Sequence, residues 1–166
     1  MNIHSALAFK QEVNAFPCVR VATMPDLPQL LQMGRDLHRE NGLLNLAEDK
    51  IEDIAYRGIK GDGGVIGVIG AVRLVQAIIH LVIGQYWYTN DVHIEELYSY
   101  VRPEFRKSDN AKSLIEFAKR CSDRMKIPLL IGVVSNHRTE EKVRLYRRRL
   151  GCPAGAYFLY NAKTGE

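Results

Sequence analysis

Apolar and polar residues follow two different periods along this chain, which predicts a domain built from both strands and helices. Apolar residues at helical spacing predict helices over residues 27–41, 46–58 and 111–126, and a last helix that ends at Gly151. Residues 1–17 show no strong period and are expected to form a lead-in segment. Short apolar or alternating runs predict strands at Cys18–Thr23, Val65–Ile69, Ala77–Ile83, Ile94–Val101, Pro128–Val134 and Ala156–Tyr160.

The expected order of elements is therefore β-α-α-β-β-β-α-β-α-β. No internal repeat, low-complexity segment or linker divides it, so we expect residues 1–166 to form one α/β (or α+β) domain around a mixed sheet. Two helices carry clear start signals. Asp26 is a capping residue followed by Pro28 in the first turn and Gln29 at the capping-box position, and Thr139 is the expected cap of the last helix.

The most apolar stretch of the chain, Gly64–Gly84, is long enough to resemble a membrane span. Arg73, Gln76 and His80 interrupt it, and its many β-branched residues and glycines favour strands. We therefore expect two buried strands here and no contact with a membrane.

Composition and charge narrow the function classes only moderately. Of 166 residues, 46% are hydrophobic and 25% are charged, which is ordinary for a globular domain. The formal net charge of +4 favours anionic ligands without singling out nucleic acid. Cys18, Cys121 and Cys152 are few, odd in number and widely spaced, which is untypical of a disulfide framework or a zinc ribbon. With no long apolar N-terminal segment, we expect a cytoplasmic protein with reduced thiols.

Candidate chemistry gathers between His93 and Lys112. The pattern predicts a strand that carries Glu95 and Glu96, then a bend, a basic loop and the start of a helix. Free N–H groups at a helix start, beside the cations of this loop, form an anion site. A carboxylate on the neighbouring strand could act as a base, so the segment predicts an anionic cofactor and a proton transfer close together.

This loop resembles the cofactor loop of the GNAT superfamily of acyl-CoA-dependent N-acetyltransferases, and the likeness extends over roughly residues 19–160. The loop has the sequence VRPEFRKSDNA, in which Val101, Pro103, Arg106 and Ala111 match the family pattern. Asp109 stands where the family usually has glycine.

Farther along the chain, an Asn after the next strand and a Tyr in the following helix match the family at its usual separation. These residues are Asn136, and Tyr146 within LYRRRLGC. The family likeness implies a mostly antiparallel mixed sheet flanked by helices.

The resemblance implies an acetyl-CoA site. The pyrophosphate would bind the backbone N–H groups of the loop, and the pantetheine arm would lie along the preceding strand, which a bulge splays from its neighbour. The cofactor-binding residues implied are Ser99, Tyr100, Val101, Arg106, Lys107, Ser108, Asp109, Asn110, Ala111 and Asn136.

The resemblance also implies direct acetyl transfer to an amine. Glu95 lies where some members carry a general base and would act through water, and Tyr146 would protonate the leaving sulfur. A backbone amide near Tyr100 or Val101 would polarise the thioester carbonyl. The amine acceptor is not encoded in any motif, and a homodimer, common in the family, is not demonstrated by any residue.

Two other functions remain open. One is a binding protein that has the same fold but has lost catalysis. The replacement of the usual loop glycine by Asp109 would then be the visible sign of that loss. A nucleic-acid-binding module would use the basic run RLYRRRLG, although cations in a last helical turn are also expected from the helix dipole. His93 and His137 lack the spacing of metal ligands, so we expect no metal.

Overall fold

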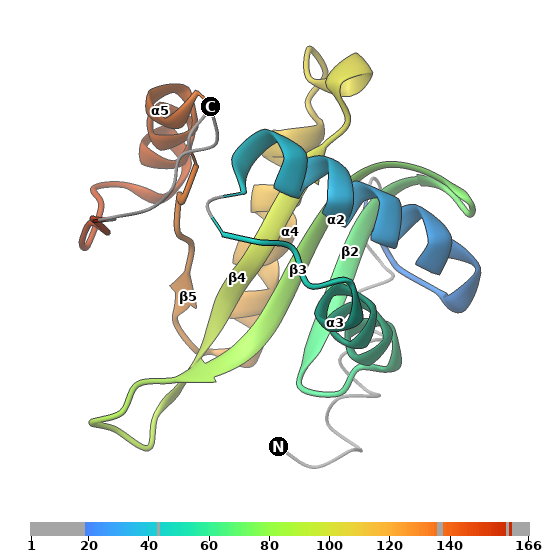
Figure 1. Cartoon of the computed structure of the whole chain (residues 1–166). Coiled ribbons are helices and arrows are strands. Elements are labelled where there is room, and N and C mark those ends of the chain that lie inside the picture. Colours follow the sequence, from blue (N-terminus) through green and yellow to red (C-terminus); the bar gives the residue numbers. More distant parts are fainter. Residues whose placement is uncertain (1–18, 43, 136–137, 159, 161–166) are drawn as a thin grey trace.

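A five-stranded sheet forms the centre of the computed structural model, which describes residues 19–42, 44–135, 138–158 and 160 (Figure 1). The first four strands are antiparallel neighbours, and the fifth joins the fourth in parallel. The predicted mixed, mostly antiparallel architecture is thus confirmed. In spatial order the strands are β1 Arg20–Val21, β2 Gly64–Ala71, β3 Leu74–Gln85, β4 Val92–Val101 and β5 Leu129–Leu130.

Helices cover both faces of this sheet (Figure 1). The helices α2 and α3 lie on one face, α4 lies on the other, and α5 lies beyond β5. Two 3₁₀ turns, η1 and η2, lead into α2 and toward α4. The bounds are η1 Met24–Asp26, α2 Leu27–Asn41, α3 Glu48–Lys60, η2 Pro103–Phe105, α4 Asn110–Met125 and α5 Thr139–Leu150.

An apolar core lies on each face of the sheet because side chains of a strand alternate between its faces. Ile79 of β3 enters the core with Phe117 of α4. Its neighbour Ile78 enters the opposite core with Leu30 and Met33 of α2. Burial of each such side chain contributes about 1.5–3 kcal/mol, so both layers hold the sheet in place.

The predicted strands near the C-terminus are shorter or absent in the structure. The run Pro128–Val134 forms a strand only at Leu129–Leu130, and the described residues between Ala156 and Tyr160 form no strand. Tyr157 and Phe158 are exposed there. An apolar alternating sequence becomes a strand only where a partner satisfies its backbone groups, and this segment has no such partner among the described residues. The predicted lead-in segment, residues 1–17, lies outside them.

The two predicted caps act differently from expectation. The carboxylate of Asp26 makes no side-chain cap on α2. It is buried and accepts hydrogen bonds from Arg20 (2.7 and 2.8 Å) and from the backbone N–H groups of Thr23 (2.9 Å) and Arg73 (3.1 Å). Burial raises the pKa of Asp26, but these hydrogen bonds outweigh it and hold the pKa well below its ordinary value. Thr139 is the first residue of α5 rather than its cap.

The apolar stretch predicted to be two strands forms β2 and most of β3. Arg73 lies in the turn between them with φ 66°, and His80 is buried in β3. No helix within the described part of the chain is long and apolar enough to cross a membrane.

Candidate active site at the open edge of β4

A bulge in β4 lies just beyond the residues through which this strand pairs with β5. His80 of β3 pairs with Tyr98 while its neighbour Leu81 pairs with Glu96, so Leu97 is an extra residue on β4. The strand β5 pairs with β4 only through Leu129 and Leu130, before the bulge. Beyond the bulge, β4 therefore has no paired strand on its β5 side among the described residues.

The open edge presents backbone groups of the residues expected to line a cofactor arm. The N–H of Arg102 donates to the carbonyl of Gln76 on β3 (3.0 Å). Because backbone direction alternates along a strand, Tyr100 also faces β3, whereas Ser99 and Val101 face the open side. An unpaired edge of this kind can bind an extended ligand with amide groups as an added strand.

The loop after β4 brings backbone N–H groups to the same end of the edge. Helix α4 begins at Asn110, and the N–H groups of Ala111 and Lys112 in its first turn have no acceptor within the helix. Ser108 donates its hydroxyl to the carbonyl of Phe105 (2.6 Å) and accepts the N–H of Asn110 (3.2 Å). The loop is thereby held in a turn that leads into a helix start, which is the arrangement that binds anions.

Two residues of this loop carry exposed charge of opposite sign. Lys107 and Asp109 are both exposed. Asp109 occupies the N-cap position of α4, but its side chain makes no cap hydrogen bond. The carboxylate of Asp109 therefore forms no hydrogen bond with the helix start. Its negative charge offsets the positive charge of Lys107 beside the N–H groups of this helix start.

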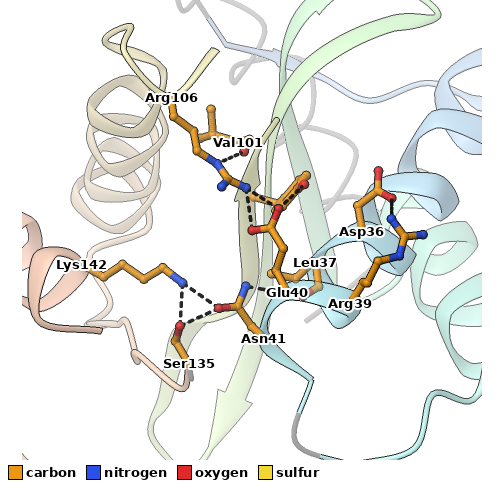
Figure 2. A network of polar contacts seen from close by, with 10 residues as sticks. Asp36, Leu37, Arg39, Glu40, Asn41, Val101, Arg106, Ser135 and Lys142 are labelled. Atoms are coloured by element: carbon orange, nitrogen blue, oxygen red, sulfur yellow. Dashed lines mark hydrogen bonds and ion pairs between the residues drawn. The ribbon is translucent and has the colours of Figure 1, made fainter. Parts of the chain in front are cut away.

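The side chain of Arg106 is engaged with Glu40, at the end of α2 (Figure 2). Its Nη2 lies 2.7 and 2.6 Å from the two carboxylate oxygens of Glu40, and its Nε donates to the carbonyl of Val101 (2.9 Å). The hydroxyl of Tyr100 donates to the same carboxylate (3.0 Å). Arg106 thus occupies a backbone acceptor of the open edge and ties the loop to α2.

Tyr146 of α5 and Glu96 of β4 are joined by a hydrogen bond beside the open edge. The hydroxyl of Tyr146 donates to the carboxylate of Glu96 (3.3 Å) and lies 3.4 Å from Oγ of Ser99. Burial raises the pKa of Glu96 and also that of Tyr146, so both groups hold a proton more readily than in water. The structure brings the predicted residues Tyr146 and Ser99 together with Glu96, which was not among the predicted site residues.

Glu95, the predicted base, points away from Tyr146. Glu95 and His93 share one face of β4, with 4.0 Å between Oε2 and Nε2, and the Glu95 side chain is 47% exposed. Glu96 leaves the strand on the opposite face. The sequence shows two adjacent glutamates on this strand. Which of them reaches Tyr146 depends on which face of β4 meets α5.

A second polar group lies where α5 faces the end of α2 (Figure 2). Nζ of Lys142 lies 2.8 Å from Oγ of Ser135 and 3.1 Å from Oδ1 of Asn41, and Ser135 donates to Asn41 (2.6 Å). The predicted Asn136 lies outside the described residues. The described residues contain no cluster of His, Cys, Asp and Glu that could hold a metal ion.

Comparison with known proteins finds relatives by structure alone. No family model matches the sequence, and no curated protein does. An integron cassette protein from the mobile metagenome of Cole Harbour salt marsh is similar with a TM-score of 0.66 and 20% identity, over 90% of this chain and 93% of that chain.

Two acetyltransferase structures are similar to the same degree. The enzyme AAC(6')-Iy, in complex with the bisubstrate analogue CoA-S-monomethyl-acetylneamine, matches with a TM-score of 0.68 and 13% identity, over 87% of this chain and 97% of that one. A possible acetyltransferase from Clostridium difficile 630 matches with a TM-score of 0.67 and 19% identity, over 89% and 97%.

Proposed function

The chain has the fold of the GNAT superfamily of N-acetyltransferases, and we propose that it transfers an acetyl group from acetyl-CoA to an amine. The observation that carries this proposal is the edge of β4 from the Leu97 bulge onward, which has no paired strand on its β5 side among the described residues. That edge runs from the Glu96–Tyr146 pair at one end to a helix start with free N–H groups at the other.

The donor would bind along this edge. The pantetheine amides would pair with the backbone of Ser99 and Val101, and the pyrophosphate would lie against the loop from Lys107 to Ala111. Arg106 would then exchange the carboxylate of Glu40 for phosphate oxygens, which a guanidinium also binds by charge-assisted hydrogen bonds. The unpaired backbone edge and the helix start suit the amides and phosphates of the donor, and Glu40 and Asp109 are negative charges that oppose it.

The chemistry would be direct attack of the amine on the thioester carbonyl. A carboxylate whose pKa is raised toward neutral pH is suited to accept the amine proton, which favours Glu96 over Glu95 as the base. Tyr146, whose phenol stays protonated at neutral pH, would donate to the departing sulfur. The hydrogen bond between the two side chains offers a path that returns the proton from Glu96 to Tyr146.

One observation favours a second candidate, a binding protein on this fold without catalysis. The arginine of the loop is already paired with a carboxylate, and Asp109 adds negative charge beside the phosphate site. If these charges keep acetyl-CoA out, the open edge would remain free for another extended ligand.

Thermal unfolding with and without acetyl-CoA tests the proposal. A ligand at about 100 times its dissociation constant adds about 2.7 kcal/mol of stability, which raises the midpoint of a domain of this size by about 5–10 °C. The same samples, supplied with a panel of amines, should release free thiol. Absence of a shift at millimolar acetyl-CoA would contradict the proposal and favour the binding protein.

A further inference from the structure

Lys142 projects from α5 into the space between that helix and the end of α2 (Figure 2). Its amine donates to Ser135, in the segment after β5, and to Asn41, the last residue of α2. Both partners are neutral oxygens that accept N–H bonds. They fix the position of the nitrogen, and neither forms an ion pair with it.

The same residue lies one helical turn before Tyr146. Residues four apart on a helix share a face, with about 5–6 Å between their Cβ atoms. Tyr146 contacts Glu96 of β4, so the face of α5 that carries the acid–base pair also carries the amine. Lys142 is therefore attached to the same rigid element as the group proposed to protonate the leaving sulfur.

The surroundings of Lys142 favour its neutral, nucleophilic form. Among the described residues, no carboxylate forms an ion pair with it, and the nearby Glu40 is held by Arg106. The charged groups that face it are Glu40 of α2, Arg106 of the loop, Arg138 at the start of α5 and Glu96 of β4. Burial is the largest effect and lowers the pKa of Lys142, with Arg106 and Arg138 acting in the same direction against the two carboxylates.

We propose that Lys142 is an acetyl acceptor within the protein itself, modified by the donor bound along the open edge of β4. This inference rests on the proposed function. The lone pair of Nζ attacks the thioester carbonyl, a C–N bond forms, and the C–S bond breaks. The nitrogen loses one proton to Glu96, the departing thiolate gains one from Tyr146, and Glu96 returns its proton to Tyr146 through their hydrogen bond, so an amide and a free thiol result with no other reactant.

Acetylation would change the junction between α5 and α2. The amide keeps one N–H where the ammonium has three, so it cannot donate to both Ser135 and Asn41. It also removes a positive charge near Glu40 and Glu96 and adds an acetyl group beside the site. We expect the modified protein to transfer acetyl groups to added amines several-fold more slowly than the unmodified one.

The test is incubation of the purified protein with acetyl-CoA but without an amine, followed by intact mass measurement and peptide mapping. We expect one acetyl group per chain, located on Lys142, with a rate constant independent of protein concentration. The rate should rise with pH through a pKa below that of an ordinary lysine. Lys142→Arg should abolish the modification, Tyr146→Phe should slow it at least tenfold, and Lys119→Arg, on the exposed face of α4, should leave it unchanged.

Acetyl-CoA binding is measured on the same samples by thermal shift, which separates the two proposals. Binding without acetylation of Lys142, or acetylation spread evenly over the lysines, would overturn this inference and leave the proposed function standing. Absence of binding would overturn both. Modification that is unaffected by Tyr146→Phe would show uncatalysed chemistry and would also overturn it.

Discussion

At the scale of single residues, the charged side chains around the loop between β4 and α4 determine which ligands the open edge of β4 can bind. Arg106 bridges Glu40 and the carbonyl of Val101, so one guanidinium occupies a backbone acceptor of the edge and joins α2 to the loop. An anionic ligand competes with Glu40 for this side chain. Under the proposed function, Glu40 would oppose binding of the donor, and its removal should strengthen that binding.

We expect Glu40→Gln to bind acetyl-CoA roughly tenfold more tightly, a change of about 1.4 kcal/mol, because Arg106 is freed and a nearby negative charge is lost. The ion pair is partly exposed, so its loss should cost less than about 1 kcal/mol of folding stability. Calorimetric titration measures the affinity. Glu48→Gln, which breaks the Arg35–Glu48 pair elsewhere on the surface, is the matched control and should leave the affinity unchanged.

The two adjacent glutamates of β4 should differ sharply in catalysis. We expect Glu96→Gln to lower kcat about 100-fold at neutral pH, the usual contribution of a general base, with little effect on donor binding. Glu95→Gln, the matched control on the opposite face, should retain most of the activity. In the unmodified protein, activity should rise with pH through a pKa above that of an ordinary carboxyl, because burial raises the pKa of Glu96. Equal losses in the two variants would remove Glu96 from the proposed role.

At the scale of elements, close packing fixes helix α3 on the sheet. Gly58 of α3 leaves no room for a Cβ atom, which would lie 2.6 Å from Nε2 of His80 and 2.7 Å from Cδ1 of Ile66. In contrast, a Cβ at Gly34 of α2 would lie 3.1 Å from Cγ2 of Ile51. The first position is a contact between a helix and the sheet, and the second is a contact between two helices.

We expect Gly58→Ala to destabilise the fold by about 1–3 kcal/mol, in spite of the helix propensity of alanine, which is worth about 1 kcal/mol. Gly34→Ala, the matched control, should change the stability by less than about 1 kcal/mol, since the methyl contact there can relax. Urea unfolding midpoints of both variants measure the difference. A gain in stability for Gly58→Ala would show that α3 can shift away from β2 and β3.

The positions of most helices and strands were predictable from the sequence, because the apolar residues of each core-forming segment repeat with the period of a helix or of a strand. The strands β2, β3 and β4 and the helices α2, α3 and α4 lie close to their predicted ranges. Two features were not predictable. The family resemblance implied a bulge in β4, but its position could not be predicted because the extra residue Leu97 looks like an ordinary strand residue. The segment Ala156–Tyr160 has the pattern of a strand but no partner among the described residues.

At the scale of the whole molecule, a buried histidine links folding to pH. His80 lies at the centre of the sheet, where burial lowers its pKa to about 4, and its Nδ1 has no hydrogen-bond partner in the described structure. The folded protein therefore keeps His80 neutral, whereas the unfolded chain takes up a proton near pH 6.5. Because only the unfolded state takes up this proton, the fold loses stability as the pH falls.

We expect the free energy of unfolding to fall by about 3 kcal/mol between pH 6.5 and pH 4 from His80 alone, and this contribution to level off below pH 4. Chemical denaturation across this range measures the slope. His80→Leu should flatten it, whatever its effect on stability at pH 7. His38→Gln, at the partly exposed end of α2, should leave the slope intact, and an equal flattening by both variants would contradict the assignment to His80.

The sequence by itself determined the classes and order of most elements, the basic loop before α4 and the position of Tyr146 on the last helix. These follow from local periodicity and from the chemistry of neighbouring residues, which a linear pattern contains. Only the tertiary structure decided that Glu96 rather than Glu95 meets Tyr146, that Arg106 pairs with Glu40, and that Lys142 lies beside Asn41. Each of these contacts joins segments far apart in the chain, and the Leu97 bulge sets the faces of β4, so no local pattern could specify them.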